Sequence, residues 1–206
     1  MKKLTFISAL VASAVFSAGA NANLITNGSF ETPEVSGYSF ETILPGWGST
    51  GDVELWNRDS GSQPTGPAPY LGSQYLELNS RGGGPYSIYQ SFNSVIGTIY
   101  EVSFAHSARR NTNPAEEFSF YFGDSNGNGD TFNIVNGPQG SWTTATYNFM
   151  ATSETSKLEF AAIVPSTGTI GNFFDGVSVT NVPEPATLAL LGLGLAGLGA
   201  ARRRKA

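Results

Sequence analysis

Residues 99–105 read IYEVSFA and carry the clearest secondary-structure signal in the chain. Tyr100, Val102 and Phe104 alternate there with Glu101 and Ser103. Successive side chains of a β-strand point to opposite faces of a sheet, so the alternation places three large apolar side chains on one face. The stretch therefore predicts a strand with one face in a hydrophobic core.

The same kind of pattern recurs on both sides of this stretch. No helical apolar periodicity occurs between residues 23 and 181, and short runs bounded by Gly, Pro and Asn are found instead. Nine or ten such strands predict an all-β fold, a two-sheet sandwich of jelly-roll or Greek-key type. Besides 99–105, the expected strands are 24–31, which Asn27-Gly28 breaks, and 53–56, 75–79, 87–92, 118–122, 131–135, 142–149, 157–164 and 173–180.

The N-terminal segment has the parts of a secretory signal peptide. Lys2 and Lys3 precede an uncharged apolar run over residues 4–16, and small residues follow up to Ala22. We expect a signal helix within residues 1–22 and cleavage after Ala22, with cleavage after Ala20 as the alternative. The run is short for a retained membrane anchor.

The C-terminal segment, residues 182–206, reads VPEPATLALLGLGLAGLGAARRRKA. Its two prolines disfavour helix and keep the first residues extended and accessible. The uncharged run that follows predicts a transmembrane helix over residues 186–201. The terminal basic cluster is expected to stay cytoplasmic, which leaves the preceding domain on the far side of the membrane; it consists of Arg202, Arg203, Arg204 and Lys205.

This order of proline box, apolar run and basic cluster resembles the PEP-CTERM sorting signal of Gram-negative bacteria. Pro183, Glu184 and Pro185 form the motif. The resemblance implies that an exosortase, a membrane cysteine peptidase, recognises the chain and cuts near the motif. The inner membrane would then hold the protein as a transient intermediate on its way to the cell surface or extracellular matrix. An ordinary tail anchor is the alternative.

Between the two ends lie residues 23–181, which suit one domain with a substantial core. The whole chain has 11 Lys and Arg against 16 Asp and Glu; this part keeps 5 and 15 of them, a net charge of −10. That charge argues against nucleic acid and disfavours anionic lipid as a partner of the domain. The absence of cysteine excludes thiol catalysis and zinc–thiolate sites.

Short motifs of this domain occur in an order that resembles the galactose-binding-like jelly-roll modules of carbohydrate-binding modules and plant cell-wall proteins. The resemblance implies the fold and frequent binding of glycans. The motifs are NGSFE at 27–31, PGW at 45–47, YLELN at 75–79, IYQSF at 88–92, YEVSF at 100–104 and FDGVSV at 174–179.

The same resemblance implies a structural Ca²⁺ shared by Glu31 and Asp175, one carboxylate from each end of the domain. Backbone carbonyls near Asn27 or Gly28 would add the oxygen ligands that this ion prefers. Two solvated or capping carboxylates are the alternative. In the relatives a second Asp often stands where this chain has Gly176, which is a departure from the pattern.

A second acidic segment, residues 124–130, reads DSNGNGD and has oxygen side chains at every second position. This spacing resembles the first half of a Ca²⁺ loop. The twelfth position is Val135 rather than Glu, and no helices are expected on either side. A hairpin loop of Asn, Asp and Gly is therefore the preferred interpretation.

Glycan binding needs flat aromatic side chains that pack on the C–H face of a sugar. Trp56, Tyr70 and Tyr86 lie in or near segments rich in Gly and Pro and are the candidates for such stacking. Trp47 and Trp142 are considered too, with a place in the core of the sandwich as their alternative.

Catalytic residues are not singled out. His106 is the one histidine, and no G-x-S-x-G nucleophile motif accompanies it. Glu54, Glu77 and Glu101 lie on expected strands and keep glycoside hydrolysis open as an alternative. The first hypothesis is an exported, non-catalytic surface or matrix protein with extracellular polysaccharide as its candidate ligand. A structural matrix component without a saccharide site is the second alternative.

Overall fold

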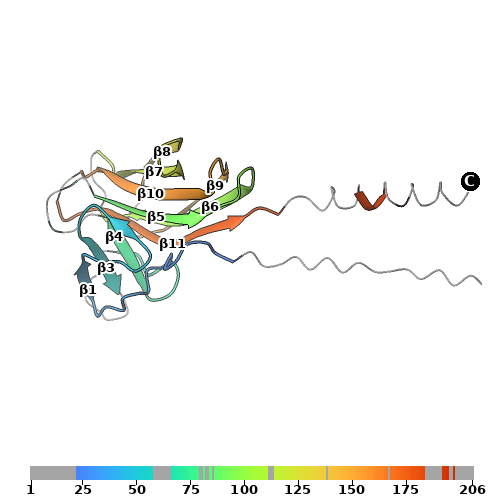
Figure 1. Cartoon of the computed structure of the whole chain (residues 1–206). Helices are drawn as coiled ribbons and strands as arrows, with labels where there is room; N and C mark the ends of the chain where they lie inside the picture. The colour runs from blue at the N-terminus through green and yellow to red at the C-terminus, as the bar shows by residue number, and fades with distance from the viewer. Residues whose placement is uncertain are drawn as a thin grey trace, which may run out of the picture.

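The computed structural model describes residues 22–57, 66–78, 81, 84, 86–110, 114–137, 139–166, 168–183, 192–194 and 197. These residues form two antiparallel sheets that pack face to face (Figure 1). The strands are β1 (Tyr38–Glu41), β2 (Gly48–Ser49), β3 (Val53–Asn57), β4 (Gln74–Leu78), β5 (Ser87–Asn93), β6 (Ile99–Ala108), β7 (Glu117–Asp124), β8 (Gly129–Val135), β9 (Thr143–Met150), β10 (Thr155–Val164) and β11 (Asn172–Asn181).

The strand order shows how the chain passes between the two sheets of the sandwich. The six-stranded sheet runs β1-β3-β4-β11-β6-β9, and the five-stranded sheet runs β2-β5-β10-β7-β8. Strands that are distant in sequence therefore lie side by side, as β11 does with both β4 and β6. The all-β, two-sheet jelly-roll prediction is confirmed, with IYEVSFA at the start of β6.

The space between the sheets is filled mainly by aromatic side chains. Phe104 of β6 lies 4.9 Å, between ring centroids, from Phe160 of β10, and Phe118 of β7 lies 4.7 Å from Phe174 of β11. All four side chains are buried. They occupy the inward positions of alternating strands, and their edge-to-face contacts add to the stabilisation that burial gives. The core thus joins both sheets in a cysteine-free domain.

The strand expected at residues 24–31 is not formed. Asn27 and Phe30 have positive φ angles of 54° and 56°, which turn the chain away from an extended course. Asn27 holds this turn with its side chain, which accepts the N–H of Thr32 at 3.1 Å and donates to the Thr32 carbonyl at 2.6 Å. The turn places Phe30 fully inside the core. The break expected at Asn27-Gly28 is thus a full turn, and the segment inserts one ring into the core without forming a strand.

Two strands were not expected from the sequence. β1 and β2 are four and two residues long. Each lies at the edge of its sheet and pairs with one neighbour, β3 and β5 respectively. Such short segments have too few alternating positions to give a periodic signal.

The N-terminal and C-terminal residues of the domain meet at one end of the sandwich, which we call the terminal pole. The Asn23 side chain donates to the Val177 carbonyl at 3.1 Å and accepts the Val179 N–H at 2.9 Å. The Leu24 N–H donates to the Val179 carbonyl at 2.8 Å. The first residues after the expected signal peptide are therefore attached to the last strand.

The expected signal peptide, residues 1–22, lies outside the described residues except for its last position. So do Glu184, Pro185, the basic cluster and most of the expected transmembrane helix, of which residues 192–194 and 197 are described as helical. Within the part of the chain that the structure describes, no helix has the length and apolar character needed to cross a membrane.

Candidate functional site

The outer face of the five-stranded sheet carries a groove of about 540 Å³, here called the tyrosine groove. Strands β7 and β10 form its floor, and the turn between β7 and β8 forms one end. Outward positions of these strands alternate with core positions, so polar side chains and one aromatic ring face solvent together. Residues lining the groove include Ser119, Tyr121, Asp124, Asn126, Lys157 and Glu159.

Tyr121 and Tyr89 flank a charged pair in this groove. The Lys157 ammonium lies 4.9 Å from the ring centroid of Tyr89 and 6.0 Å from that of Tyr121, and it contacts the Glu159 carboxylate at 2.6 Å. Cation–π attraction therefore holds Lys157 between two rings. Burial, together with the carboxylates of Asp124 and Glu159, raises the pKa of Tyr121, so its hydroxyl stays neutral.

The end of the groove is a stiff hairpin. The Asp124 side chain accepts the N–H groups of Asn126 at 2.8 Å and Asn128 at 2.9 Å, and the Asn128 amide at 2.9 Å. The Tyr121 hydroxyl donates to the Asp124 carbonyl at 2.7 Å. The hydrogen bonds from Asn128 lower the pKa of Asp124. The hairpin interpretation of residues 124–130 is confirmed, and its hydrogen bonds fix Tyr121 beside the loop.

The aromatic residues singled out in the sequence lie elsewhere. Trp56 is 2% exposed and Tyr86 is 7% exposed, so neither ring offers a free face to a sugar. Trp56 packs in the buried cluster with Tyr75 and Phe173, and its Nε1 donates to Glu77 at 3.0 Å. This burial argues against the stacking hypothesis for Trp56 and Tyr86. The Gly- and Pro-rich sequence around them gave no sign that other parts of the chain cover both rings.

Tyr70, the third candidate, is accessible to solvent, with 50% of its surface exposed. Its ring lies edge-on to Trp142, whose Nε1 donates to the Ala68 carbonyl at 2.6 Å. Trp142 packs on Tyr75 of the buried cluster, and Trp47 is buried in the main core. Tyr70 is therefore an exposed ring beside Trp142, in the loop that precedes β4.

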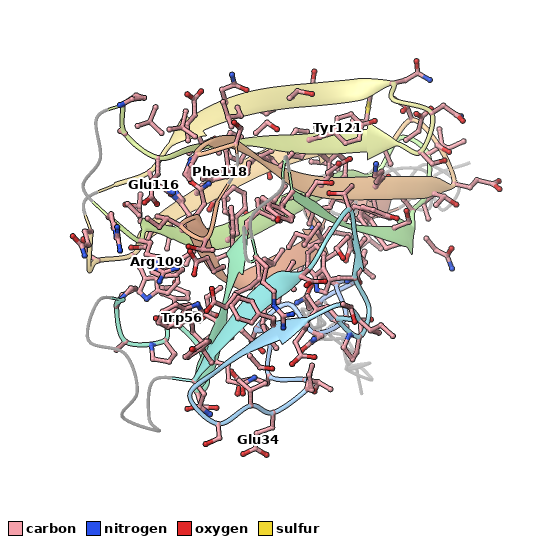
Figure 2. All side chains as sticks on the ribbon, turned by 90° about the vertical axis from the view of Figure 1, so that its left-hand side faces the viewer. Glu34, Trp56, Arg109, Glu116, Phe118 and Tyr121 are labelled. Atoms are coloured by element: carbon pink, nitrogen blue, oxygen red, sulfur yellow. The ribbon has the colours of Figure 1, made fainter. Side chains whose placement is uncertain are left out.

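A buried ion cluster lies beside Trp56 at the pole opposite the chain ends (Figure 2). The Arg109 guanidinium donates to both oxygens of Glu77 at 2.9 Å and lies 4.8 Å above the Trp56 ring. Glu54 is the cross-strand partner of Glu77, and its carboxylate is 3.8 Å from Arg109. Burial raises the pKa of both carboxyls, and the Arg109 charge opposes that shift. Glu77 is 0% exposed, so this cluster serves the fold.

His106 also belongs to the interior. Its ring packs on Phe104 and Phe118, and Nδ1 lies 2.6 Å from the Asn136 side chain, which in turn hydrogen bonds to Asn172. Burial lowers the pKa of His106 and keeps it neutral. The geometry is that of a core histidine.

Glu31 and Asp175 hold one loop from opposite ends of the domain. Glu31 accepts the N–H groups of Ser73 at 3.0 Å and Gln74 at 2.9 Å. Asp175 accepts those of Tyr70 at 2.8 Å and Leu71 at 2.9 Å. Burial raises the pKa of Asp175 to about 7 although these N–H groups oppose the shift, and the charge of Glu31 adds to it.

The carbonyls expected as further calcium ligands already accept hydrogen bonds. The Asn27 carbonyl accepts from Phe30 N–H at 3.2 Å and Trp47 Nε1 at 3.1 Å, and the Gly28 carbonyl accepts from Val177 N–H at 2.8 Å. Among the described residues, no group of three or more His, Asp or Glu side chains is placed to hold a metal ion. Glu31 and Asp175 thus form a two-carboxylate arrangement.

Sequence reasoning missed the tyrosine groove. Tyr89 and Tyr121 stand at outward positions of segments 87–92 and 118–122, opposite core residues such as Ile88 and Phe120. The alternation itself was the available signal. The two rings come to either side of Lys157 because β5 pairs with β10 and β10 pairs with β7. The sequence alone does not indicate these strand pairings.

Comparison with known proteins supports the fold. Halomucin of Haloquadratum walsbyi is 28% identical over 182 residues, 81% of this chain, but the match is only 2% of halomucin's length. The structure of TmCBM61 in complex with beta-1,4-galactotriose has a TM-score of 0.56 at 17% identity and covers 78% of this chain and 99% of that one. Arabinose-bound MgGH51 α-L-arabinofuranosidase has a TM-score of 0.51 at 14% identity, covering 80% and 27%.

Two family models divide the chain. The PEP-CTERM protein-sorting motif matches residues 181–205, which confirms the resemblance of the tail. The model described as protein of unknown function (DUF642) matches residues 23–180, nearly the whole described domain. The chain is therefore a member of the DUF642 family that ends in a PEP-CTERM protein-sorting motif.

Proposed function

We propose that the domain is a non-catalytic carbohydrate-binding module that attaches an exported protein to extracellular polysaccharide. The observation that carries this proposal is the tyrosine groove, an open groove lined by Tyr121 and by the Lys157–Glu159 ion pair, with the Tyr89 ring next to Lys157. A sugar ring can pack its C–H face on tyrosine while its hydroxyls bind Lys157, Glu159 and Asn126. The jelly-roll fold shared with TmCBM61 supports the proposal as an analogy of fold.

The sorting motif supplies the route to this ligand. A PEP-CTERM motif marks an exported protein that an exosortase sorts to the cell surface. We infer that the signal peptide starts export, that the apolar run holds a transient intermediate in the inner membrane, and that cutting near Pro183 releases the domain. An acidic domain at the surface avoids anionic partners and suits a neutral polysaccharide.

Tyr121→Ala is expected to weaken binding to the polysaccharide by about tenfold, or about 1.4 kcal/mol, because it removes a stacking face from the groove. Tyr70→Ala is the matched control, since it removes an exposed tyrosine from the loop before β4, which does not line the groove. Affinity electrophoresis in the exopolysaccharide of the producing cells, followed by a glycan array, measures both. Loss of binding in Tyr70→Ala alone would move the site to the 66–72 loop.

The two alternative functions have distinct outcomes in this experiment. A structural matrix component without a saccharide site would bind no glycan in any variant. A hydrolase would release reducing ends from the polysaccharide and lose turnover with a pair of facing carboxylates. Glu54 and Glu77 are the facing pair found on strands, and their burial under Arg109 and Trp56 gives a substrate no access to them.

We also propose that Glu31 and Asp175 bind a structural Ca²⁺. The two carboxylates hold the same loop, and this supports the proposal together with the raised pKa of Asp175, because a cation there would offset an unfavourable negative charge. Bound Ca²⁺ would join the two ends of the domain. A melting temperature that responds neither to EDTA nor to added Ca²⁺ would contradict this assignment.

The pH dependence of unfolding tests the same site. An Asp with a folded pKa of about 7 against an unfolded value of 3.8 favours the folded state below pH 4, and this contribution is lost as the pH rises to 7. Without Ca²⁺ we therefore expect the free energy of unfolding to fall over this range, and Asp175→Asn to remove part of the fall. Urea unfolding at several pH values measures it. A wild-type curve that Asp175→Asn leaves unchanged would show that Asp175 does not titrate there.

A further inference from the structure

A row of exposed apolar side chains crosses the six-stranded sheet at the terminal pole. Met150 of β9 lies opposite Ile99 of β6, and the Val182 N–H donates to the Ile99 carbonyl at 2.8 Å. Met150 is 62% exposed, and Ile99 and Val182 are also open to solvent. Cross-strand neighbours on one face of a sheet lie within contact distance of one another. The three side chains therefore form one continuous outward surface.

The turn between β5 and β6 extends this surface. Val95 and Ile96 stand on the turn, and Ile96 is 61% exposed. The turn is fixed to the next connection of the chain, because the Gly97 N–H donates to the Ala151 carbonyl at 2.8 Å and the Ala151 N–H to the Thr98 carbonyl at 3.0 Å. Together these side chains make the apolar end patch, which consists of Val95, Ile96, Ile99, Met150 and Val182.

The apolar end patch lies next to the point where the sorting tail begins. β11 runs out of the sandwich at this pole (Figure 1). Only residues 183–185 separate Val182 from the start of the uncharged apolar run at residue 186. Residues 182 and 186 are four positions apart, and an extended chain of that length spans at most about 14 Å. Whatever surrounds the beginning of the apolar run must therefore lie within about this distance of the patch.

We propose that the apolar end patch rests on the interfacial zone of the bilayer while the sorting tail is inserted. The inference rests on the membrane intermediate of the proposed function. An apolar patch beside an inserted helix can enter the headgroup region. The neighbouring carboxylates are Glu101, two residues beyond Ile99, and Glu154, which lines a hollow with Val95 and Ile96. Negative charge at the patch favours a zwitterionic lipid surface and apolar insertion that salt does not weaken.

Contact of the apolar end patch with the bilayer has a consequence for sorting. A domain held at the surface by two contacts, the tail and the patch, keeps one orientation relative to the membrane. The proline box of residues 183–185 would then be presented at a constant height and on a constant side. After cutting, the patch alone is too small to anchor the domain, so release follows.

The absence of cysteine in the chain allows a direct test with single introduced cysteines. Ile96→Cys and Met150→Cys carry an environment-sensitive fluorophore in the patch. Arg110→Cys, just beyond the opposite end of β6, is the matched control, and Leu190→Cys reports on the tail. The precursor is produced by export in a bacterium without an exosortase, purified, and reconstituted into vesicles of zwitterionic phospholipid. Melting temperatures of the labelled variants verify that each is folded.

The expected result is blue-shifted emission and quenching by lipid-borne nitroxides at positions 96, 150 and 190, unchanged by high salt, with aqueous emission at 110. Aqueous emission at 96 and 150 together with a buried label at 190 would overturn the proposed contact between the patch and the bilayer and leave the proposed sorting intermediate intact. Aqueous emission at 190 would overturn both. Agreement between the labels at 96 and 150 guards against a local effect of either substitution.

Discussion

Arg109→Met is expected to lower the free energy of unfolding at neutral pH by about 3–5 kcal/mol, because it leaves buried carboxylates without their partner. Arg109 donates to both oxygens of Glu77, which has no solvent exposure, and it also faces Glu54. Met retains much of the side-chain length over Trp56 but not the charge. The charge, rather than the packing, is therefore what the substitution removes.

At acidic pH the free energy of unfolding of Arg109→Met should differ less from that of the wild type. Burial raises the pKa of Glu54 and of Glu77, and the Arg109 charge that opposes this shift is absent in Arg109→Met, so acid neutralises these two carboxyls before ordinary ones. Once they are neutral, they no longer need a cation. Urea unfolding at pH 7.5 and pH 5 measures the effect, with exposed Arg110→Met as the matched control, expected within about 0.5 kcal/mol of wild type. An equal loss at both pH values would contradict the electrostatic explanation.

Phe160→Ala is expected to cost a similar amount, about 3–5 kcal/mol, because it opens a cavity where the two sheets meet. The Phe160 ring lies 4.9 Å from Phe104 and 4.8 Å from Phe174 on the opposite sheet, and 5.5 Å from Phe120 on its own. The neighbouring rings are held by their own strands, so they cannot collapse fully into the space.

Tyr89→Ala is the control for Phe160→Ala. Tyr89 stands on the strand next to β10, and its side chain points to the solvent-facing side of the same sheet. For Tyr89→Ala we expect little loss of stability but weaker polysaccharide binding. For Phe160→Ala we expect the reverse: a large loss of stability, with normal binding while the variant remains folded. Thermal and urea unfolding measure the stabilities. Comparable destabilisation by both substitutions would contradict the assignment of the inner and outer faces.

The fold could be read from the sequence wherever strands alternate over five or more residues. β6, β7 and β10 were predicted for this reason, because their inward aromatic residues leave a strict two-residue period. The prediction failed at residues 24–31, where positive φ angles at Asn27 and Phe30 replace a strand by a turn. Apolar content indicated burial there correctly, and only the backbone course was wrong.

The candidate site was less accessible to sequence reasoning. Trp56 looked like a stacking residue because of its neighbours in sequence, whereas the Tyr38 and Phe173 rings and the Arg109 guanidinium that pack on it come from other parts of the chain. Tyr121 and Lys157 are 36 positions apart and become neighbours through the pairing of β7 with β10. A groove assembled from strand pairing is a property of the topology, which local patterns do not contain.

Hydroxyl-radical footprinting of tyrosines, with and without saturating exopolysaccharide fragments, tests the central claim most directly. Tyr121 lines the groove and Tyr89 lies next to its Lys157, whereas Tyr38 on β1 and Tyr70 in the loop before β4 are exposed elsewhere. A carbohydrate-binding tyrosine groove predicts that the ligand reduces oxidation of Tyr89 and Tyr121 and leaves Tyr38 and Tyr70 unchanged. Protection of Tyr70 alone, or of none of the four, would contradict it.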